Sequence, residues 1–181
     1  MLRKLLVLLV FAVAGLLFYA NAQPPEFRIE RSVEIAAPPE RIFPLLSDFR
    51  GWSQWSPWER KDPDMTREYG ATTAGPGATY GWSGNSDVGT GTMRMVEVVP
   101  VSHVEIDLRF SEPMEDQSTV RFDVVPNAAG GSVVTWSMQG ENNFVSRLIT
   151  VFVSIDSMVG PDFEVGLAQL KAIAEGSGRA P

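Results

Sequence analysis

Apolar and polar residues alternate strictly along three segments in the second half of the chain. In each segment every second residue is apolar, and most positions between carry charged or hydroxyl-bearing side chains. This period of two is typical of β-strands that bury one face and expose the other. We therefore expect antiparallel strands of one sheet with a single dry face. The apolar positions are Val104, Ile106, Leu108 and Phe110, then Val120, Phe122 and Val124, then Val134, Trp136 and Met138.

The first half of the chain gives a weaker pattern. Residues 27–35 alternate in the same way and predict an early strand with one wet face. Pro38 and Pro39 then begin a short amphipathic helix, which Pro44 is expected to kink. Residues 50–88 are rich in glycine, proline, serine and tryptophan, and within them we expect strands at 65–69 and 78–83.

The chain ends in a helical pattern. Apolar residues recur at steps of three and four from Phe144 to Val159, and again from Leu167 to about Glu175. Gly160 and Pro161 lie between these stretches, so we expect the helix to break there. Residues 176–181 are expected to form a flexible tail.

Together these elements predict an α+β fold. The order is a strand, a short helix, a run of antiparallel strands and a long terminal helix. The dry face of the sheet needs a cover, and the terminal helix is the largest element available. We expect a curved sheet wrapped around this helix, with a space between them unless large side chains fill it.

The N-terminus carries a hydrophobic targeting segment, assigned to residues 1–22. Arg3 and Lys4 precede an uncharged run from Leu5 to Ala20, which would span roughly 24 Å as a helix. Residues 20–22 have the small-x-small pattern of a signal peptidase site. The segment is therefore either a cleaved signal peptide or a retained anchor. Either would place the domain outside the cytoplasmic membrane, periplasmic or secreted. Residues 23–26 form a spacer.

Composition excludes several classes of function. Beyond residue 22 the chain carries 13 basic and 22 acidic residues, a formal charge of −9. Such an acidic body argues against nucleic acid and against binding anionic lipid headgroups by charge. With no cysteine and a single histidine, thiolate and multi-histidine metal sites are excluded. We expect no metal ion and no cofactor.

Short sequences along the body give a family resemblance, which runs from about Phe27 to Glu175. The chain resembles the START-like helix-grip superfamily (SRPBCC), and within it the polyketide cyclase/dehydrase and lipid-transport group. This resemblance implies a helix-grip domain over residues 27–175. It does not select a function, because carriers, cyclases and partner-binding modules share the scaffold. The matching segments are residues 43–49, 52–58, 80–85, 89–93 and 155–167.

Eight residues are candidates for lining a cavity between sheet and helix. The aromatic residues would gate or line it, and the methionines would adapt to ligands of varied shape. The alternative for both residue types is ordinary core packing. The candidates are Trp55, Trp82, Met93, Met95, Trp136, Met138, Phe152 and Asp156.

Two of the titratable residues have open interpretations. Asp156 lies in an otherwise apolar stretch and would either give the cavity polarity or face outward, paired with a basic residue such as Arg147 or Arg94. His103 shares its strand parity with Glu105 and Asp107, so we expect it to be solvent-exposed and dispensable.

Three functions remain open. The first is non-catalytic binding or carriage of a small hydrophobic or amphipathic ligand, lipid- or polyketide-like. The second is a cyclase or dehydratase acting on such a ligand, with Asp156 or Tyr80 as proton shuttle. The third is an envelope module with a filled core that binds a protein partner. The expected partners are a small hydrophobic molecule and, through residues 1–22 if uncleaved, the membrane; no particular protein partner is indicated.

Overall fold

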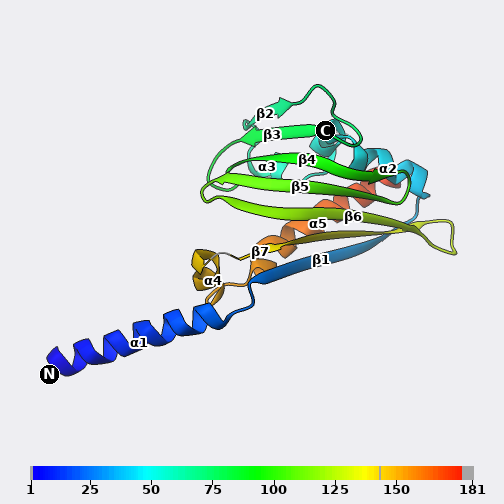
Figure 1. The fold of residues 1–181 in the computed structure, drawn as a ribbon. Helices are drawn as coiled ribbons and strands as arrows, with labels where there is room; N and C mark the ends of the chain where they lie inside the picture. The colour runs from blue at the N-terminus through cyan, green and yellow to red at the C-terminus, as the bar shows by residue number, and fades with distance from the viewer. Residues whose placement is uncertain (1, 143, 177–181) are drawn as a thin grey trace.

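The computed structural model describes residues 2–142 and 144–176 of the chain, so most of the expected tail at 176–181 lies outside the described residues. A seven-stranded antiparallel sheet forms the body of the molecule (Figure 1), in the order β1-β7-β6-β5-β4-β3-β2. This is the α+β fold predicted from the order of the elements, in the helix-grip arrangement that the family resemblance implied. The strands are β1 (Glu26–Ile35), β2 (Thr66–Tyr69), β3 (Thr79–Ser83), β4 (Thr90–Val99), β5 (His103–Glu112), β6 (Asp116–Pro126) and β7 (Ser132–Glu141).

The register between neighbouring strands aligns their inward-facing side chains in rows across the sheet. One row crosses five strands and is entirely apolar: Ile29, Met138, Val120, Ile106 and Met95 are successive partners. All five of these side chains are buried. The predicted dry face of the sheet is therefore confirmed, and it is continuous from β1 to β4.

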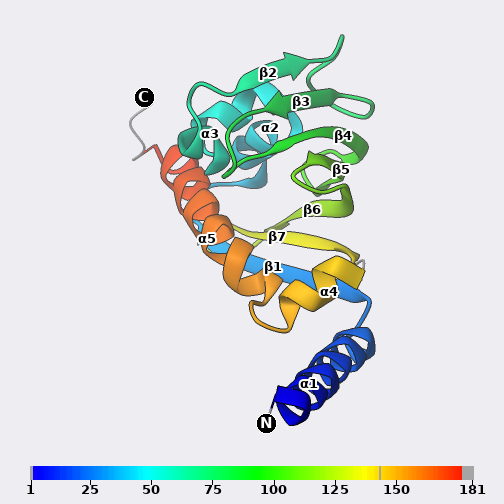
Figure 2. The ribbon, with the colours of Figure 1, turned by 90° about the vertical axis from the view of Figure 1, so that its left-hand side faces the viewer.

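Helices cover the concave face of the sheet, as Figure 2 shows in a view toward the strand ends nearest α1 (Leu2–Ala22). The longest cover is α5 (Ile155–Ala174), which packs mainly on β1. Three short elements complete the cover: α2 (Pro39–Ser47), the 3₁₀-helix η1 (Phe49–Gln54) and α3 (Trp58–Lys61). The sheet thus wraps around helices on one side only.

The predicted break at Gly160 and Pro161 is wrong. The C-terminal region breaks earlier, between α4 (Phe144–Thr150) and α5, and the two helices meet at 82°. The Ser154 side chain caps α5 by accepting from the Ser157 amide at 3.1 Å. Gly160 lies inside α5, where a side chain would collide with the Arg31 guanidinium. This glycine permits a close approach and does not end the helix.

The N-terminal helix α1 is longer than its uncharged run suggests. Its 21 residues have a mean hydropathy of 2.4 over the most apolar window. At about 1.5 Å per residue the helix reaches roughly 31 Å, enough to cross a hydrocarbon core of about 30 Å. It projects away from the domain (Figure 1), and its C-terminal end packs against α4. Such a helix is compatible with either a signal sequence or an anchor.

Aromatic rings fill the centre between the sheet and α5. Trp136 from β7 stacks on Phe163 from α5, with ring centroids 4.0 Å apart and planes 9° from parallel. Trp55 and Phe122 meet Trp136 at 5.6 and 4.9 Å. Gly166, one turn along α5, allows the helix to lie against the Trp136 ring, because a β-carbon there would come within 2.8 Å of it. We call Trp52, Trp55, Phe122, Trp136 and Phe163 the ring cluster.

Removing Phe163 should therefore destabilise the whole domain. We expect Phe163→Ala to lower the free energy of unfolding by about 3–5 kcal/mol, because it deletes a stacked ring and leaves a cavity. The control is Val165→Ala on the exposed side of the same helix, which should change it by less than about 0.5 kcal/mol. Urea unfolding of the purified full chain, followed by circular dichroism, measures both. Equal effects of the two variants would contradict the packing described.

Candidate ligand-binding site

The inner part of the grip is closed by two tryptophans from η1 and its cap. A 3₁₀-helix has three residues per turn, so Trp52 and Trp55 project from the same side. Their indole nitrogens donate to the carbonyl oxygens of Leu46 and Leu45, at 3.1 and 2.9 Å. Both rings are buried. The two acceptor oxygens belong to the last turn of α2, where backbone carbonyl groups have no partner within the helix. These two residues therefore act as core packing, which was the alternative left open for the tryptophans.

A second set of apolar side chains lies on the inner side toward the strand ends nearest α1, and these are only half-buried. Trp82 packs edge-on against Phe110 with centroids 5.4 Å apart, over Gly91, which has no side chain to obstruct the indole. Trp58 contacts Trp136 from α3, and the Lys61–Asp162 ion pair at 2.6 Å ties α3 to α5. We call this set the inner rim: Phe27, Trp58, Trp82, Met93, Phe110 and Val159.

The structure brings six of the eight sequence candidates to the inner side. Four of these are fully within the core, and Trp82 and Met93 belong to the inner rim. The other two lie elsewhere: Phe152 is 72% exposed in the connector between α4 and α5, and Asp156 is exposed in the first turn of α5. The four core residues are Trp55, Met95, Trp136 and Met138.

Asp156 pairs outward with a basic residue, although not with either one considered from the sequence. Its carboxylate accepts two hydrogen bonds from Arg31, at 2.8 and 3.0 Å, and Arg31 also donates to Glu164 at 2.9 Å. The Arg31 guanidinium lowers the pKa of Asp156 below its usual range. Arg31 was not among the predicted site residues. The available signal was its position, because the other residues of β1 with the same strand parity are all apolar.

Tyr80 is held by a charged pair that the sequence did not indicate. Its hydroxyl donates to Glu59 Oε1 at 3.1 Å, and Glu59 Oε2 lies 2.7 Å from an Arg67 guanidinium nitrogen. Burial, and then the negative charge of Glu59, raise the pKa of Tyr80. The hydroxyl thus keeps its proton and has a fixed acceptor. Nothing in the local pattern of residues 59 and 67 signalled this contact.

The ring cluster contains one polar atom without a partner among the described residues. Trp136 is buried, and its indole nitrogen has no hydrogen-bond acceptor within residues 2–142 and 144–176. A buried donor left unpaired costs roughly 1–3 kcal/mol. A ligand oxygen placed beside this ring would remove that cost.

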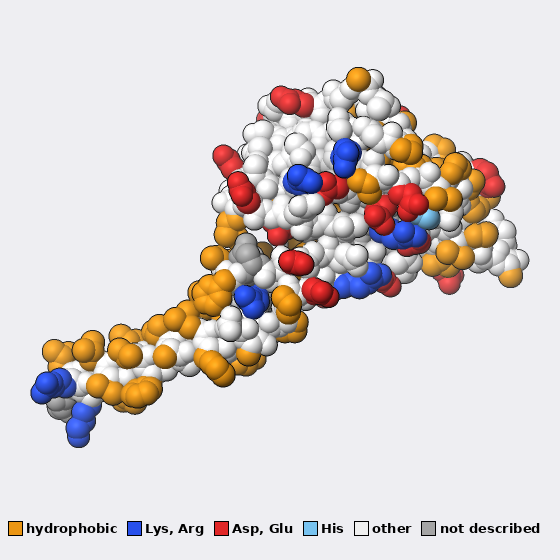
Figure 3. Space-filling model, viewed as in Figure 1, with side chains coloured by type: hydrophobic (Ala, Val, Ile, Leu, Met, Phe, Trp, Pro, Cys, Tyr) orange, Lys and Arg blue, Asp and Glu red, His pale blue; other side chains and the backbone are white. Residues whose placement is uncertain are grey.

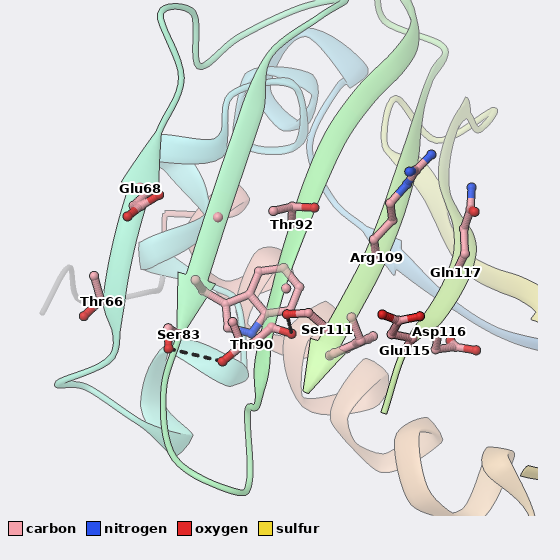
Figure 4. Close-up of a pocket in the computed structure, with 14 residues that line it drawn as sticks. Thr66, Glu68, Ser83, Thr90, Thr92, Arg109, Ser111, Glu115, Asp116 and Gln117 are labelled. Carbon is pink, nitrogen blue, oxygen red and sulfur yellow. Dashed lines mark hydrogen bonds between the residues drawn. The ribbon is translucent and has the colours of Figure 1, made fainter. Parts of the chain in front are cut away.

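Two depressions among the described residues open on the outer face of the sheet. The larger has a volume of about 720 Å³ and crosses β2 to β6. Hydroxyl and charged side chains surround much of it (Figure 4), including Thr92, Arg109 and Gln117. Trp82 and Phe110 of the inner rim also line it. The second, of about 500 Å³, adjoins it at Gly81, where the outer face has no side chain. Neither depression is the apolar space expected between sheet and helix.

His103 also lies on the outer face, as its strand parity predicted. Its side chain is only 15% exposed, however, and its Nε2 lies 3.0 Å from a Glu97 carboxylate oxygen. The side chain of His103 is therefore less exposed to solvent than expected. Its partner Glu97 lies on the neighbouring strand β4.

Comparison with known proteins establishes the family. The model of the family "Polyketide cyclase / dehydrase and lipid transport" matches residues 26–175, and the chain belongs to this family. The fold of this family suggests binding of hydrophobic molecules. No curated protein matches the chain.

Solved structures agree on the fold. Aha1 from Colwellia psychrerythraea, solved as a dimer, is 17% identical with a TM-score of 0.61, covering 84% of this chain and 99% of its own. A protein from Thermobifida fusca is 22% identical with a TM-score of 0.58, covering 85% and 97%. A protein from Chromobacterium violaceum is 18% identical with a TM-score of 0.56, covering 84% and 99%. At these identities the likeness shows the fold alone.

The Arg31–Asp156 pair predicts a pH-dependent anchoring of the start of α5. Because the folded pKa of Asp156 is lowered, its contribution to stability is present above the unfolded value, about 3.9, and disappears as pH falls through the folded value. We expect Asp156→Asn to speed amide hydrogen exchange in residues 155–160 at neutral pH. Wild type should lose this protection on acidification.

The matched control is Asp87→Asn, which removes an exposed carboxyl in the loop between β3 and β4. It should leave exchange in residues 155–160 unchanged. Equal exchange in wild type and Asp156→Asn at neutral pH would show that the ion pair does not hold the helix.

Proposed function

We propose that the domain binds the apolar part of a small hydrophobic or amphipathic molecule, lipid- or polyketide-like, at the inner rim. The observation that carries this proposal is the set of half-buried apolar side chains of the inner rim, which lies beside a centre filled with rings. Half-buried aromatic residues that share one face supply the apolar lining typical of ligand sites. Membership of the family supports the same class of ligand.

The unpaired indole N–H of Trp136 favours a ligand that carries a hydrogen-bond acceptor. Trp58 from the inner rim lies edge-on to Trp136 at 5.7 Å, so the rim and the ring cluster are contiguous. A ligand with a carbonyl or hydroxyl oxygen would satisfy the indole N–H while its apolar part covers the rim. We therefore favour an amphipathic ligand over a pure hydrocarbon.

Two observations bear on the alternatives. The filled ring cluster favours the partner-binding module, because it occupies the centre of the space that a large ligand would need. For the cyclase or dehydratase, both candidate proton shuttles are already engaged: Asp156 by Arg31 and Tyr80 by Glu59. The geometry gives neither group an evident path to a ligand at the inner rim.

The location outside the cytoplasmic membrane belongs to the same proposal. Arg3 and Lys4 at the start of α1 favour a cytoplasmic N-terminus, which places the domain on the other side. We also propose that α1 is retained as an anchor. Ala20, within the small-x-small pattern, is fully buried, and Arg147 from α4 donates to the Asn21 carbonyl at 3.2 Å. In the folded chain these contacts cover the residues at the cleavage pattern.

Filling the inner rim should remove ligand binding without unfolding the domain. We expect Val159→Trp to lower the fraction of chain that retains a small molecule about tenfold, because the larger ring occupies the rim from α5. The measurement is native mass spectrometry of the full chain purified from its own source, with identification of the retained molecule.

The control for this experiment is Val165→Trp, the same substitution on the exposed side of the same helix, which should retain the ligand as wild type does. Circular dichroism verifies that both variants fold. Ligand retention unchanged in Val159→Trp, or no retained molecule in wild type, would refute binding at the inner rim and favour the partner-binding module.

A further inference from the structure

The surface of α4 and the connector that follows it is unusually apolar. Five side chains within residues 144–153 are large, hydrophobic and exposed, with Phe152 the most exposed. Met158, in the second turn of α5, extends this surface. Only one charged residue, Arg147, occurs between positions 144 and 153. We call residues 144–153 the foot; its exposed apolar residues are Phe144, Val145, Ile149, Phe152 and Val153.

The foot is continuous with α1. The helix α4 packs against the C-terminal end of α1, and the one charged side chain of the foot is directed at that end, donating to the Asn21 carbonyl. Figure 3 shows hydrophobic side chains covering α1 and continuing onto the domain where the two meet. The apolar surface of α1 and that of the foot therefore form one patch.

The length of α1 determines how deep in the membrane the foot would lie. At about 1.5 Å per residue the helix covers roughly 27 Å from Lys4 to Ala22, so if Arg3 and Lys4 lie at the inner boundary, Ala20 to Ala22 lie a few Å inside the outer boundary of a hydrocarbon core of about 30 Å. The foot packs beside these last residues. Apolar and aromatic side chains at that depth meet the acyl chains and headgroups of the outer leaflet.

We propose that the foot is a membrane-docking element, which inserts its apolar side chains into the outer leaflet beside α1. Attraction to anionic headgroups does not drive this contact, because the foot carries a single cation. Exposed carboxylates at the neighbouring strand ends, such as Glu26 and Glu141, limit insertion to the foot itself. Docking would hold the domain in one orientation, with the inner rim turned toward the membrane surface.

The absence of cysteine from the chain allows a direct test. We would attach a nitroxide to Phe152→Cys in the foot, and as a control to Val125→Cys, an exposed apolar residue near the opposite ends of the strands. The full chain is reconstituted into phosphatidylcholine bilayers. Electron paramagnetic resonance then compares access of the label to oxygen, which concentrates in lipid, with access to a water-soluble nickel chelate.

The proposal predicts an oxygen-to-nickel access ratio several-fold higher at position 152 than at position 125. A second label, at Val145→Cys, should give the same high ratio as the label at position 152. Agreement between the two would show that the high ratio is not an artefact of the Phe152→Cys substitution. Equal ratios at 152 and 125 would overturn the proposal. Spin–spin broadening at 152 would also overturn it, because it would show that a second copy of the chain covers the foot. The result does not depend on ligand binding at the inner rim.

Discussion

The stacking of Trp136 on Phe163 is the contact on which the rest of the structure depends. It joins the middle of β7, the strand beside the edge strand β1, to the middle of α5 at a ring separation of 4.0 Å. A curved antiparallel sheet with one dry face needs such a cover, and the short helices α2 and α3 are too small to supply it alone. Gly166 makes the approach possible, and the other rings of the cluster pack around the pair. The position of α5 then determines how much of the inner face is left half-buried.

This arrangement divides the grip into a closed part and an accessible part. The ring cluster and the indole-to-backbone hydrogen bonds of Trp52 and Trp55 close the centre. The inner rim lies toward α1, where side chains are only half-buried. If α1 anchors the chain and the foot contacts lipid, the accessible part faces the membrane surface. A lipid-like ligand would then enter without crossing bulk water, which removes part of the cost of exposing its apolar chain.

The sequence predicted the sheet well, because strand parity is a local property. The residues expected on the dry face of the last strands are buried or half-buried, and the two uncertain strands at 65–69 and 78–83 are present as β2 and β3. The order of the elements followed from the same local patterns, and the family resemblance implied that they form a helix-grip domain.

The site was less predictable, because its features depend on contacts between distant residues. The partner of Asp156 is Arg31, 125 positions away, and only the packing of α5 on β1 brings them together. Gly160 resembled a helix stop, although its role is to let Arg31 approach. The apolar residues of the foot follow a helical period, which by itself does not distinguish a side that faces a core from one that faces lipid. The same ambiguity placed Phe152 among the cavity candidates.

The central claim is that the apolar part of the ligand occupies the inner rim and not the ring cluster. The five tryptophans provide natural reporters, two in the inner rim and three in the ring cluster. A stearic acid with a nitroxide near its methyl end is added to the isotope-labelled full chain, and nuclear magnetic resonance records the indole N–H signals. The account predicts broadening of the Trp58 and Trp82 signals, little effect at Trp52, and loss of the broadening in Val159→Trp. Equal broadening of Trp52 and Trp82, or broadening that persists in Val159→Trp, would contradict it.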